Sequence, residues 1–187
     1  MAKFYLSTPL TKNDILRLHI GDEVFLNGTI YLARDAAHQR FLELLDNKQE
    51  LPVDLRNEII LYAGPTPPKP GQVIGSLAPT TAARMDPYSP RMFKYGVNAV
   101  IGKGPRSQSV KESCKKNTTL CFSAIGGLSV ILSRKVKAVE VVAYEDLGTE
   151  AVRKLQVVEF PVLVVYDAHG GDLYEQEITK YRTLEVR

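Results

Sequence analysis

The sequence contains no tryptophan, only two cysteines and only three histidines among its 187 residues. So few cysteines exclude a disulfide framework, and they do not supply the ~4 ligands of a closed zinc or iron–sulfur site. Cys114 and Cys121 are spaced C-x6-C, which matches neither a zinc ribbon nor a C-x-x-C redox pair. We expect Cys121 to be buried and Cys114 to be a more exposed thiol. We therefore expect this chain alone to bind no metal.

Long hydrophobic runs and strong charge are also absent. No apolar segment approaches the roughly 20 residues that cross a bilayer, and residues 1–18 lack the apolar core and cleavage site of a secretory signal. We expect a cytoplasmic protein without membrane contact. The net charge is only +3, and the basic residues are neither massed nor interleaved with aromatic side chains. These patterns argue against nucleic-acid binding.

Length and periodicity predict one layered α/β domain that spans residues 1–187. A hydrophobic fraction of 44% and a charged fraction of 24% are ordinary for a globular domain of this size. Apolar strands alternate with helical segments, which is the pattern of βαβ units. Strands are predicted at 58–65, 73–79, 97–104, 118–127, 138–144 and 160–171, with a hairpin at 23–33 that turns at Asn27-Gly28. Helices are predicted at 34–47, 107–117, 127–136 and 146–157, with a short helical or turn segment at 12–24 and a helix that ends at 91–96.

Three segments share the order apolar strand, polar or glycine-rich loop, helix: YLA-RDAAH, SLAP-TTAARMD and AVI-GKGPRS. In α/β sheets the carboxyl ends of the strands and the N-termini of the following helices form the ligand crevice. The pattern therefore predicts that Arg34, Thr80, Arg84 and Lys103 converge. An arginine fork matches a carboxylate and a lysine adds a compact charge, so this group suits a small dicarboxylate or a phosphate.

Each of these positions also has a purely structural explanation. Thr80 and Thr81 are suited to cap a helix, and Arg34 is suited to a solvated pair with Asp35, itself a plausible helix cap. His38, one turn beyond Arg34, suits an acid, a base or an orienting group, but a lone histidine on an alanine-rich helix also suits a structural role.

The loop around Lys103 matches a phosphate loop only in part. It lacks the G-x-x-x-x-G-K-[ST] pattern, because Pro105 and Arg106 stand where the hydroxyl residue should follow. Taken alone, the loop leaves open a non-catalytic module that binds an anion or a nucleotide. Arg106 lies just outside the glycine loop, and we expect its replacement by lysine to be tolerated.

Five segments form a combination more diagnostic than any one of them: GTIYLARDAAHQRF, YAGPTPPKPGQVIGSLAPTTAARMD, VIGKG, SAIGG and VVAYEDLGTEAV. Together, over residues ~20 to 170, they resemble the β subunit of class I fumarate hydratases in the family's order. The β subunits of L(+)-tartrate dehydratases share this framework. Intact RDAAH and YEDLG motifs make the chain more similar to the fumarase branch.

The resemblance implies a heteromeric hydro-lyase that adds water reversibly to fumarate and gives (S)-malate. It implies an oxygen-sensitive [4Fe-4S] cluster held by a partner α subunit and not by this chain, in a heterodimer or heterotetramer. It also implies a swivelling β/β/α domain that closes over the cluster. A hydratase for tartrate or a methylated fumarate, and a structural partner that has lost catalysis, are the alternatives.

The resemblance also assigns roles to individual residues. Arg34 and Arg84 match arginines that bind the substrate carboxylates, and Lys103 matches a third cationic contact. Thr80 matches a threonine that takes part in proton transfer at the substrate carbon. Because a threonine hydroxyl is a poor base, this role requires a neighbouring acid or base, which we expect to be an aspartate of the partner subunit.

Three further motif residues are candidates for the same site. His38 is a candidate catalytic residue or an orienting group, Thr81 is a candidate substrate-binding hydroxyl, and Asp35 is expected to orient Arg34.

Overall fold

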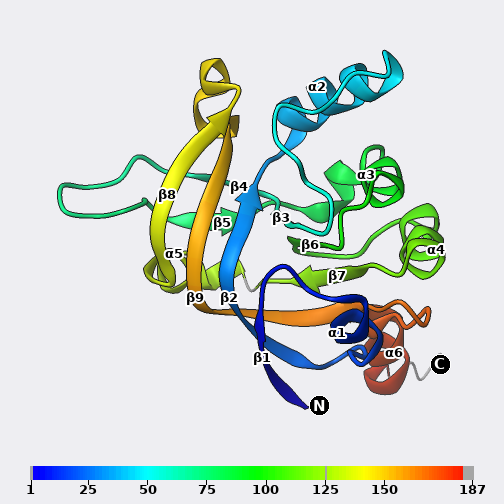
Figure 1. The fold of residues 1–187 in the computed structure, drawn as a ribbon. Coiled ribbons are helices and arrows are strands. Elements are labelled where there is room, and N and C mark those ends of the chain that lie inside the picture. The colour runs from blue at the N-terminus through cyan, green and yellow to red at the C-terminus, as the bar shows by residue number, and fades with distance from the viewer. Residues whose placement is uncertain (1, 125, 183–187) are drawn as a thin grey trace, which may run out of the picture.

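The computed structural model describes residues 2–124 and 126–182, which form a large sheet with helices packed against it (Figure 1). Within these residues, seven strands form the sheet in the order β1 (Lys3–Ser7), β2 (Glu23–Leu32), β3 (Ile59–Leu61), β6 (Ala99–Gly102), β7 (Leu120–Ser123), β9 (Val152–Tyr166) and β8 (Val136–Ala143). A separate two-stranded ribbon consists of β4 (Ala63–Pro65) and β5 (Leu77–Pro79). This mixture of helices and strands confirms the α/β class.

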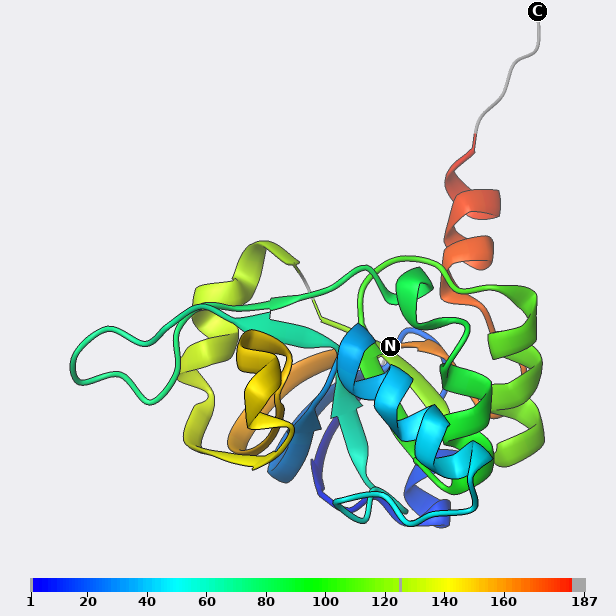
Figure 2. The ribbon, with the colours of Figure 1, turned by 90° about the horizontal axis from the view of Figure 1, so that it is seen from above.

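Three helices, α2 (Asp35–Asp46), α3 (Ser89–Tyr95) and α4 (Gln108–Asn117), lie side by side on one face of the sheet (Figures 1 and 2). The other α-helices are α1 (Lys12–Leu16), α5 (Ser129–Arg134) and α6 (Leu173–Tyr181). Short 3-10 helices are η1 (Ala82–Met85), η2 (Gly126–Leu128) and η3 (Glu145–Glu150). Strand β1 and helix α6 are additions to the elements predicted from the sequence.

The sheet closes on itself because β9 pairs with β2 as well as with β7 and β8. Neighbouring strands among β2, β3, β6 and β7 are parallel, whereas β9 runs antiparallel to its partners. Side chains of the parallel strands alternate between two apolar clusters, with Ile59 and Leu61 in one and Ile60 in the other. Both faces of these strands are therefore buried, as expected for parallel strands covered by helices.

The hairpin predicted at Asn27-Gly28 is wrong. Residues 23–32 form one continuous strand, β2, whose pairing with β9 shifts register between Leu26 and Gly28. Gly28 has a φ of +107°, and a Cβ atom there would lie 2.7 Å from Thr8 Oγ1. Gly28 therefore permits a β-bulge and the close approach of Thr8. In a sequence, a glycine needed for these reasons looks the same as the glycine of a hairpin turn.

The helix predicted at 146–157 is also wrong. Residues 145–150 form the 3-10 helix η3, and β9 begins at Val152. Val152, Leu155 and Val157 are buried in this strand, between β2 on one side and β8 on the other. Pairing along two strand edges outweighs the moderate helix preference of the segment, since strand propensity depends on such context.

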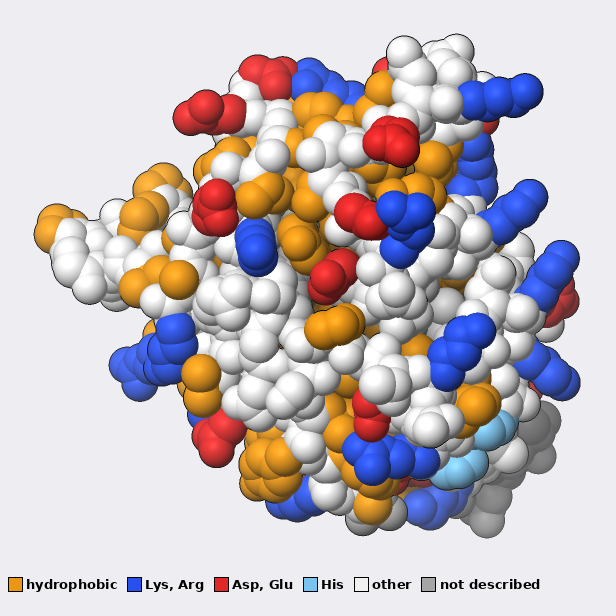
Figure 3. Space-filling model, in the orientation of Figure 1, with side chains coloured by type: hydrophobic (Ala, Val, Ile, Leu, Met, Phe, Trp, Pro, Cys, Tyr) orange, Lys and Arg blue, Asp and Glu red, His pale blue; other side chains and the backbone are white. Residues whose placement is uncertain are grey.

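The surface shows no concentration of one charge on the face drawn in Figure 3, where Lys and Arg side chains are spread out and interspersed with Asp and Glu. None of the helices in the described part of the chain has the length and apolar character needed to cross a membrane.

A buried arginine ties the loop after β6 to the segment that follows η1. The Arg106 side chain is only 2% exposed, and its Nε donates to Asp86 Oδ1 at 2.6 Å. Its Nη2 donates to Ser89 Oγ at 2.5 Å, and the guanidinium lies 5.7 Å from the centroid of the Tyr62 ring. The other carboxylate oxygen of Asp86 accepts from the backbone N–H of Ser107. Arg106 is thus an internal crosslink, so the tolerance of lysine expected at this position from the sequence does not fit its environment.

We expect Arg106→Lys to lower the free energy of unfolding by about 2–3 kcal/mol, because lysine keeps the charge but lacks the fork that reaches both partners. This replaces the tolerance expected from the sequence. Arg56→Lys is the control, since the Arg56–Asp54 pair is largely exposed and its replacement should leave the unfolding transition unchanged. Urea unfolding of both variants measures their free energies of unfolding. Equal values for Arg106→Lys and Arg56→Lys would contradict the crosslinking role of Arg106.

His38 is fully buried on the inner side of α2. Its Nδ1 lies 2.9 Å from the carbonyl oxygen of Arg34, which accepts the hydrogen bond, whereas Nε2 has no partner among the described residues. The ring packs near Phe41, Tyr62 and Tyr88. Burial in this apolar setting lowers the pKa of His38 to about 4, so the ring is neutral at pH 7.

The depressed pKa of His38 predicts a loss of stability in acid. Below its ordinary pKa of 6.5 the unfolded chain binds a proton that the folded chain does not bind until about pH 4. The stabilising contribution is therefore complete above about pH 6.5 and falls by about 3 kcal/mol as the pH drops to about 4. Urea unfolding of the wild type and His38→Gln across this window checks it. The stability difference between the two should shrink by that amount, and a constant difference would rule out His38 as the source.

Candidate functional site

The carboxyl ends of the parallel strands form one edge at which the predicted loops meet. Arg34 follows β2 by two residues, and Lys103 directly follows β6. The strand ends are aligned by hydrogen bonds from Ala33 N–H to Leu61 O at 3.2 Å and from Ala124 N–H to Gly102 O at 2.9 Å. Such an edge is the usual place of a ligand crevice in α/β sheets.

The β4–β5 ribbon brings the two threonines to the same edge. Thr80 follows β5, and its backbone N–H donates to Tyr62 O at 2.7 Å, directly beyond β3. Thr81 forms a parallel bridge with Lys103, and the N–H of Ala82 donates to Lys103 O at 2.8 Å. Thr81 and the adjacent Thr80 therefore lie beside Lys103, which belongs to a separate segment.

Neither threonine performs the capping expected from the sequence. Thr81 occupies the N-cap position of η1 but makes no side-chain capping bond. Thr80 is half-buried and Thr81 is exposed. The short η1 turn receives its support from the backbone bond from Ala82 to Lys103, and among the described residues the Thr81 hydroxyl is not used for capping.

Asp35 joins the two arginines. Its Oδ2 lies 3.4 Å from Arg34 Nε, and its Oδ1 accepts from Arg84 Nε at 3.1 Å. The Arg34 and Asp35 side chains are 21% and 26% exposed, whereas Arg84 is 55% exposed. Asp35 is the first residue of α2, with Arg34 at the N-cap position, so the expected capping role of Asp35 is wrong. Its carboxylate instead holds two guanidinium groups from distant segments next to each other.

Two contacts of Arg34 were missed by sequence reasoning. Glu150 Oε1 lies 3.5 Å from Arg34 Nη2, and Glu150 Oε2 accepts from the backbone N–H of Ala36 at 3.0 Å. Gly64 in β4 lies so close that a Cβ atom there would be 2.9 Å from Arg34 Nη1. The available signals were the glutamate of EDLGTEA and the glycine of YAGP, but neither motif reveals which residue it faces.

The burial of His38 does not fit the catalytic role expected from the sequence. The ring has no exposed surface and is neutral at pH 7. Its bond to the Arg34 carbonyl holds the backbone at the start of α2. The geometry thus supports the orienting alternative.

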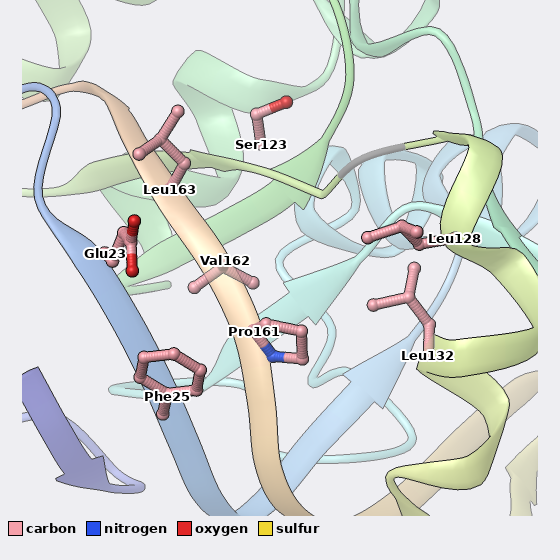
Figure 4. A pocket seen from close by; sticks show the side chains of 8 residues that line it. All are labelled: Glu23, Phe25, Ser123, Leu128, Leu132, Pro161, Val162 and Leu163. Carbon is pink, nitrogen blue, oxygen red and sulfur yellow. The ribbon is translucent and has the colours of Figure 1, made fainter. Parts of the chain in front are cut away.

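A separate apolar cavity of about 310 Å³ lies away from these residues (Figure 4). It is lined by Glu23, Phe25, Ser123, Leu128, Leu132, Pro161, Val162 and Leu163. Because its lining includes a carboxylate and no cation, it does not suit an anionic ligand.

The two cysteines face each other in the core, with their Sγ atoms 3.5 Å apart. Both are buried, which confirms the expectation for Cys121 and shows that the exposure expected for Cys114 is wrong. Cys114 lies on the inner face of α4, against β7. The described residues contain no group of three or more His, Cys, Asp or Glu side chains that could hold a metal ion. With only two cysteines, both buried, the described part of the chain therefore does not supply the ligands of an iron–sulfur cluster.

Comparison with known proteins places this arrangement in a family. The family model described as "Fumarase C-terminus" matches residues 1–177. Fumarate hydratase 2 of Leishmania major is 37% identical over 181 residues, covering 95% of this chain and 32% of the relative. The aerobic class I fumarate hydratase of Escherichia coli K12 is 38% identical over 159 residues, covering 84% of this chain and 29% of the relative.

A third relative has nearly the same length as this chain. The putative L(+)-tartrate dehydratase subunit beta of Methanocaldococcus jannaschii is 38% identical over 178 residues, covering 92% of this chain and 91% of the relative. The chain thus spans about a third of the two fumarate hydratases and most of this β subunit. Because the family model covers nearly the whole sequence, the chain belongs to the fumarase C-terminus family.

Proposed function

We propose that this chain is the β subunit of a class I fumarate hydratase, which adds water reversibly to fumarate and gives (S)-malate. The observation that carries the proposal is the pair of arginines joined by Asp35 at the strand ends, with Thr80, Thr81 and Lys103 side by side at the same edge. Two relatives named fumarate hydratases, with which the chain shares more than a third of its aligned residues, support it.

In this proposal the cations bind the substrate carboxylates. Arg84 uses Nε and Nη2 toward a single oxygen of Asp35, which leaves other N–H groups of a half-exposed guanidinium for a ligand. Arg34 and Lys103 add two further positive charges. A dicarboxylate suits three cations that are only partly neutralised by Asp35 and Glu150. The same cations favour the negative charge that builds on a carboxylate when a proton leaves the adjacent carbon.

Thr80 is the proposed proton-transfer group, and Thr81 is a proposed additional substrate contact. The half-buried Thr80 hydroxyl requires an acid or base beside it to set its protonation state, and we assign that group to the partner subunit. His38 and Asp35 position Arg34, one through its backbone carbonyl and the other through its guanidinium.

The iron–sulfur cluster belongs, in this proposal, to a partner α subunit. The described residues contain no group that could hold a metal ion, and the two cysteines are buried against each other, which supports this assignment. A domain of this β/β/α type is proposed to swivel over the partner and complete the site, in a heterodimer or heterotetramer. A second candidate, an L(+)-tartrate dehydratase, is favoured by the 38% identity over 178 residues to the relative named as its putative β subunit.

The chain alone should be folded and inactive, and adding an anaerobically prepared α subunit should produce fumarate hydration. The assembled enzyme, offered equal malate and L-tartrate, should prefer malate, because Ala82 and Ala83 beside the threonines offer no side-chain hydrogen bond to a second hydroxyl. A higher kcat/KM for tartrate would establish the second candidate. Hydration of fumarate by the chain alone would contradict the proposal that an α subunit is needed to complete the site.

Arg84→Lys should reduce the kcat/KM of the assembled enzyme at least ~100-fold, equivalent to about 3 kcal/mol, because lysine keeps the charge but loses the fork. Arg56→Lys, which changes an exposed arginine outside the site, is the control and should keep wild-type kinetics. Steady-state kinetics of both variants measure the difference. Near-wild-type turnover by Arg84→Lys would remove this residue from the site.

Thr80→Ala should lower kcat much more than it raises KM, because the proposed role is in the chemical step. Thr81→Ala should change kcat little and alter the free energy of unfolding by less than about 0.5 kcal/mol, since its hydroxyl makes no capping bond. Kinetics and urea unfolding of both variants separate the two hydroxyls. Loss of turnover in Thr81→Ala alone would exchange their roles.

A further inference from the structure

The EDLGTEA motif has no part in the proposed chemistry, yet the structure places it against the start of α2. The motif forms η3 and the turn into β9, at the upper end of the long β8–β9 hairpin in Figure 1. Arg40 on α2 donates to Asp146 at 2.9 Å, and its guanidinium lies over the Tyr144 ring. Tyr144 also packs near Phe41. The Arg40–Asp146 pair is largely exposed and contributes little by itself. Glu150 reaches the N-terminal end of the helix through its own hydrogen bond to Ala36.

Glu150 satisfies a backbone donor that the helix itself leaves unpaired. The N-cap residue of α2 is Arg34, which makes no side-chain capping bond. Glu150 Oε2 accepts from the N–H of Ala36 at 3.0 Å across a sequence separation of 114 residues. A carboxylate at this end of a helix is also favoured by the helix dipole.

The second oxygen of Glu150 faces the guanidinium of Arg34. Glu150 Oε1 lies 3.5 Å from Nη2, Asp35 Oδ2 lies 3.4 Å from Nε, and Gly64 leaves room for Nη1 by having no side chain. The Arg34 side chain is 21% exposed and the Glu150 side chain is 26% exposed. Each nitrogen of a long and otherwise mobile side chain thus has its own neighbour, from three different segments.

We propose that Glu150 is a positioning residue that holds the Arg34 guanidinium in the orientation required to bind a substrate carboxylate. This inference rests on the proposed function for the identity of the substrate. Glu150 contacts Arg34 and the α2 backbone. Its loss should therefore weaken substrate binding more than it slows the chemical step. A side chain that is already held in its binding orientation loses less conformational entropy when the ligand binds.

Glu150→Gln in the assembled enzyme separates the two contacts of Glu150. Glutamine retains the size of the side chain and an oxygen that can accept from Ala36, but it lacks the charge that attracts Arg34. We expect the KM for fumarate to rise about 10-fold with kcat changed less than about 3-fold, and the melting temperature to stay within about 2 °C. Glu150→Asp, which keeps the charge, should recover part of the lost affinity.

Asp146→Asn is the matched control, because it removes a carboxylate of the same segment that pairs with Arg40 and not with Arg34. Its KM should equal that of the wild type. Gly64→Ala displaces Arg34 Nη1 from the opposite side and should raise the KM as Glu150→Gln does, without unfolding, since only the end of a flexible side chain must move. Wild-type KM in Glu150→Gln, or an equal rise in Asp146→Asn, would overturn the proposal.

A spectroscopic measurement on the full chain keeps the inference independent of the activity. The Nε–H signal of Arg34, identified by its loss in Arg34→Lys, should shift in Glu150→Gln and stay unchanged in Asp146→Asn. An assembled wild-type enzyme without hydratase activity would contradict the proposed function, and a shifted signal would still support the positioning of Arg34. An Arg34 signal unmoved by Glu150→Gln would overturn the positioning role whatever the activity.

Discussion

The antiparallel pairing of β2 with β9 is the constraint on which the rest of the structure depends. It joins strands more than a hundred residues apart in sequence, from Glu23 opposite Leu163 to Leu32 opposite Arg153. This pairing closes the sheet and buries its interior cluster. In an antiparallel pair, the chain that leaves one strand lies beside the chain that enters the other. Arg34 and Glu150 therefore meet just beyond the last paired residues.

The placement of two carboxylates beside the site arginines is the second organising feature. Asp35 contacts both arginines, and Glu150 contacts one of them and the start of α2. Two like charges held close together would repel each other without such carboxylates between them. The arrangement keeps the guanidinium groups in place before a ligand is present, while Arg84 remains more than half exposed. A site that is prepared but open agrees with completion by a second subunit, as proposed.

Parts of the fold could be predicted because local patterns agree with the tertiary structure. The helix predicted at 34–47 corresponds to α2, and the helix predicted at 107–117 corresponds to α4, each with apolar side chains spaced for one buried face. The strand-loop-helix order placed Arg34, Thr80, Arg84 and Lys103 at one edge, where the structure has them. The segment at 146–157 failed because long-range strand pairing decides its conformation.

The sequence by itself determined the α/β class, the family resemblance and the charged residues that gather at the strand ends, because periodicity and short motifs are local properties. Only the tertiary structure decided that Arg106 is a buried crosslink, that His38 is enclosed and neutral, and that Asp35 and Glu150 hold the arginines. These roles depend on which distant segment packs against each side chain. That choice follows from sheet closure between strands far apart in the sequence, such as β2 and β9, which no local pattern encodes.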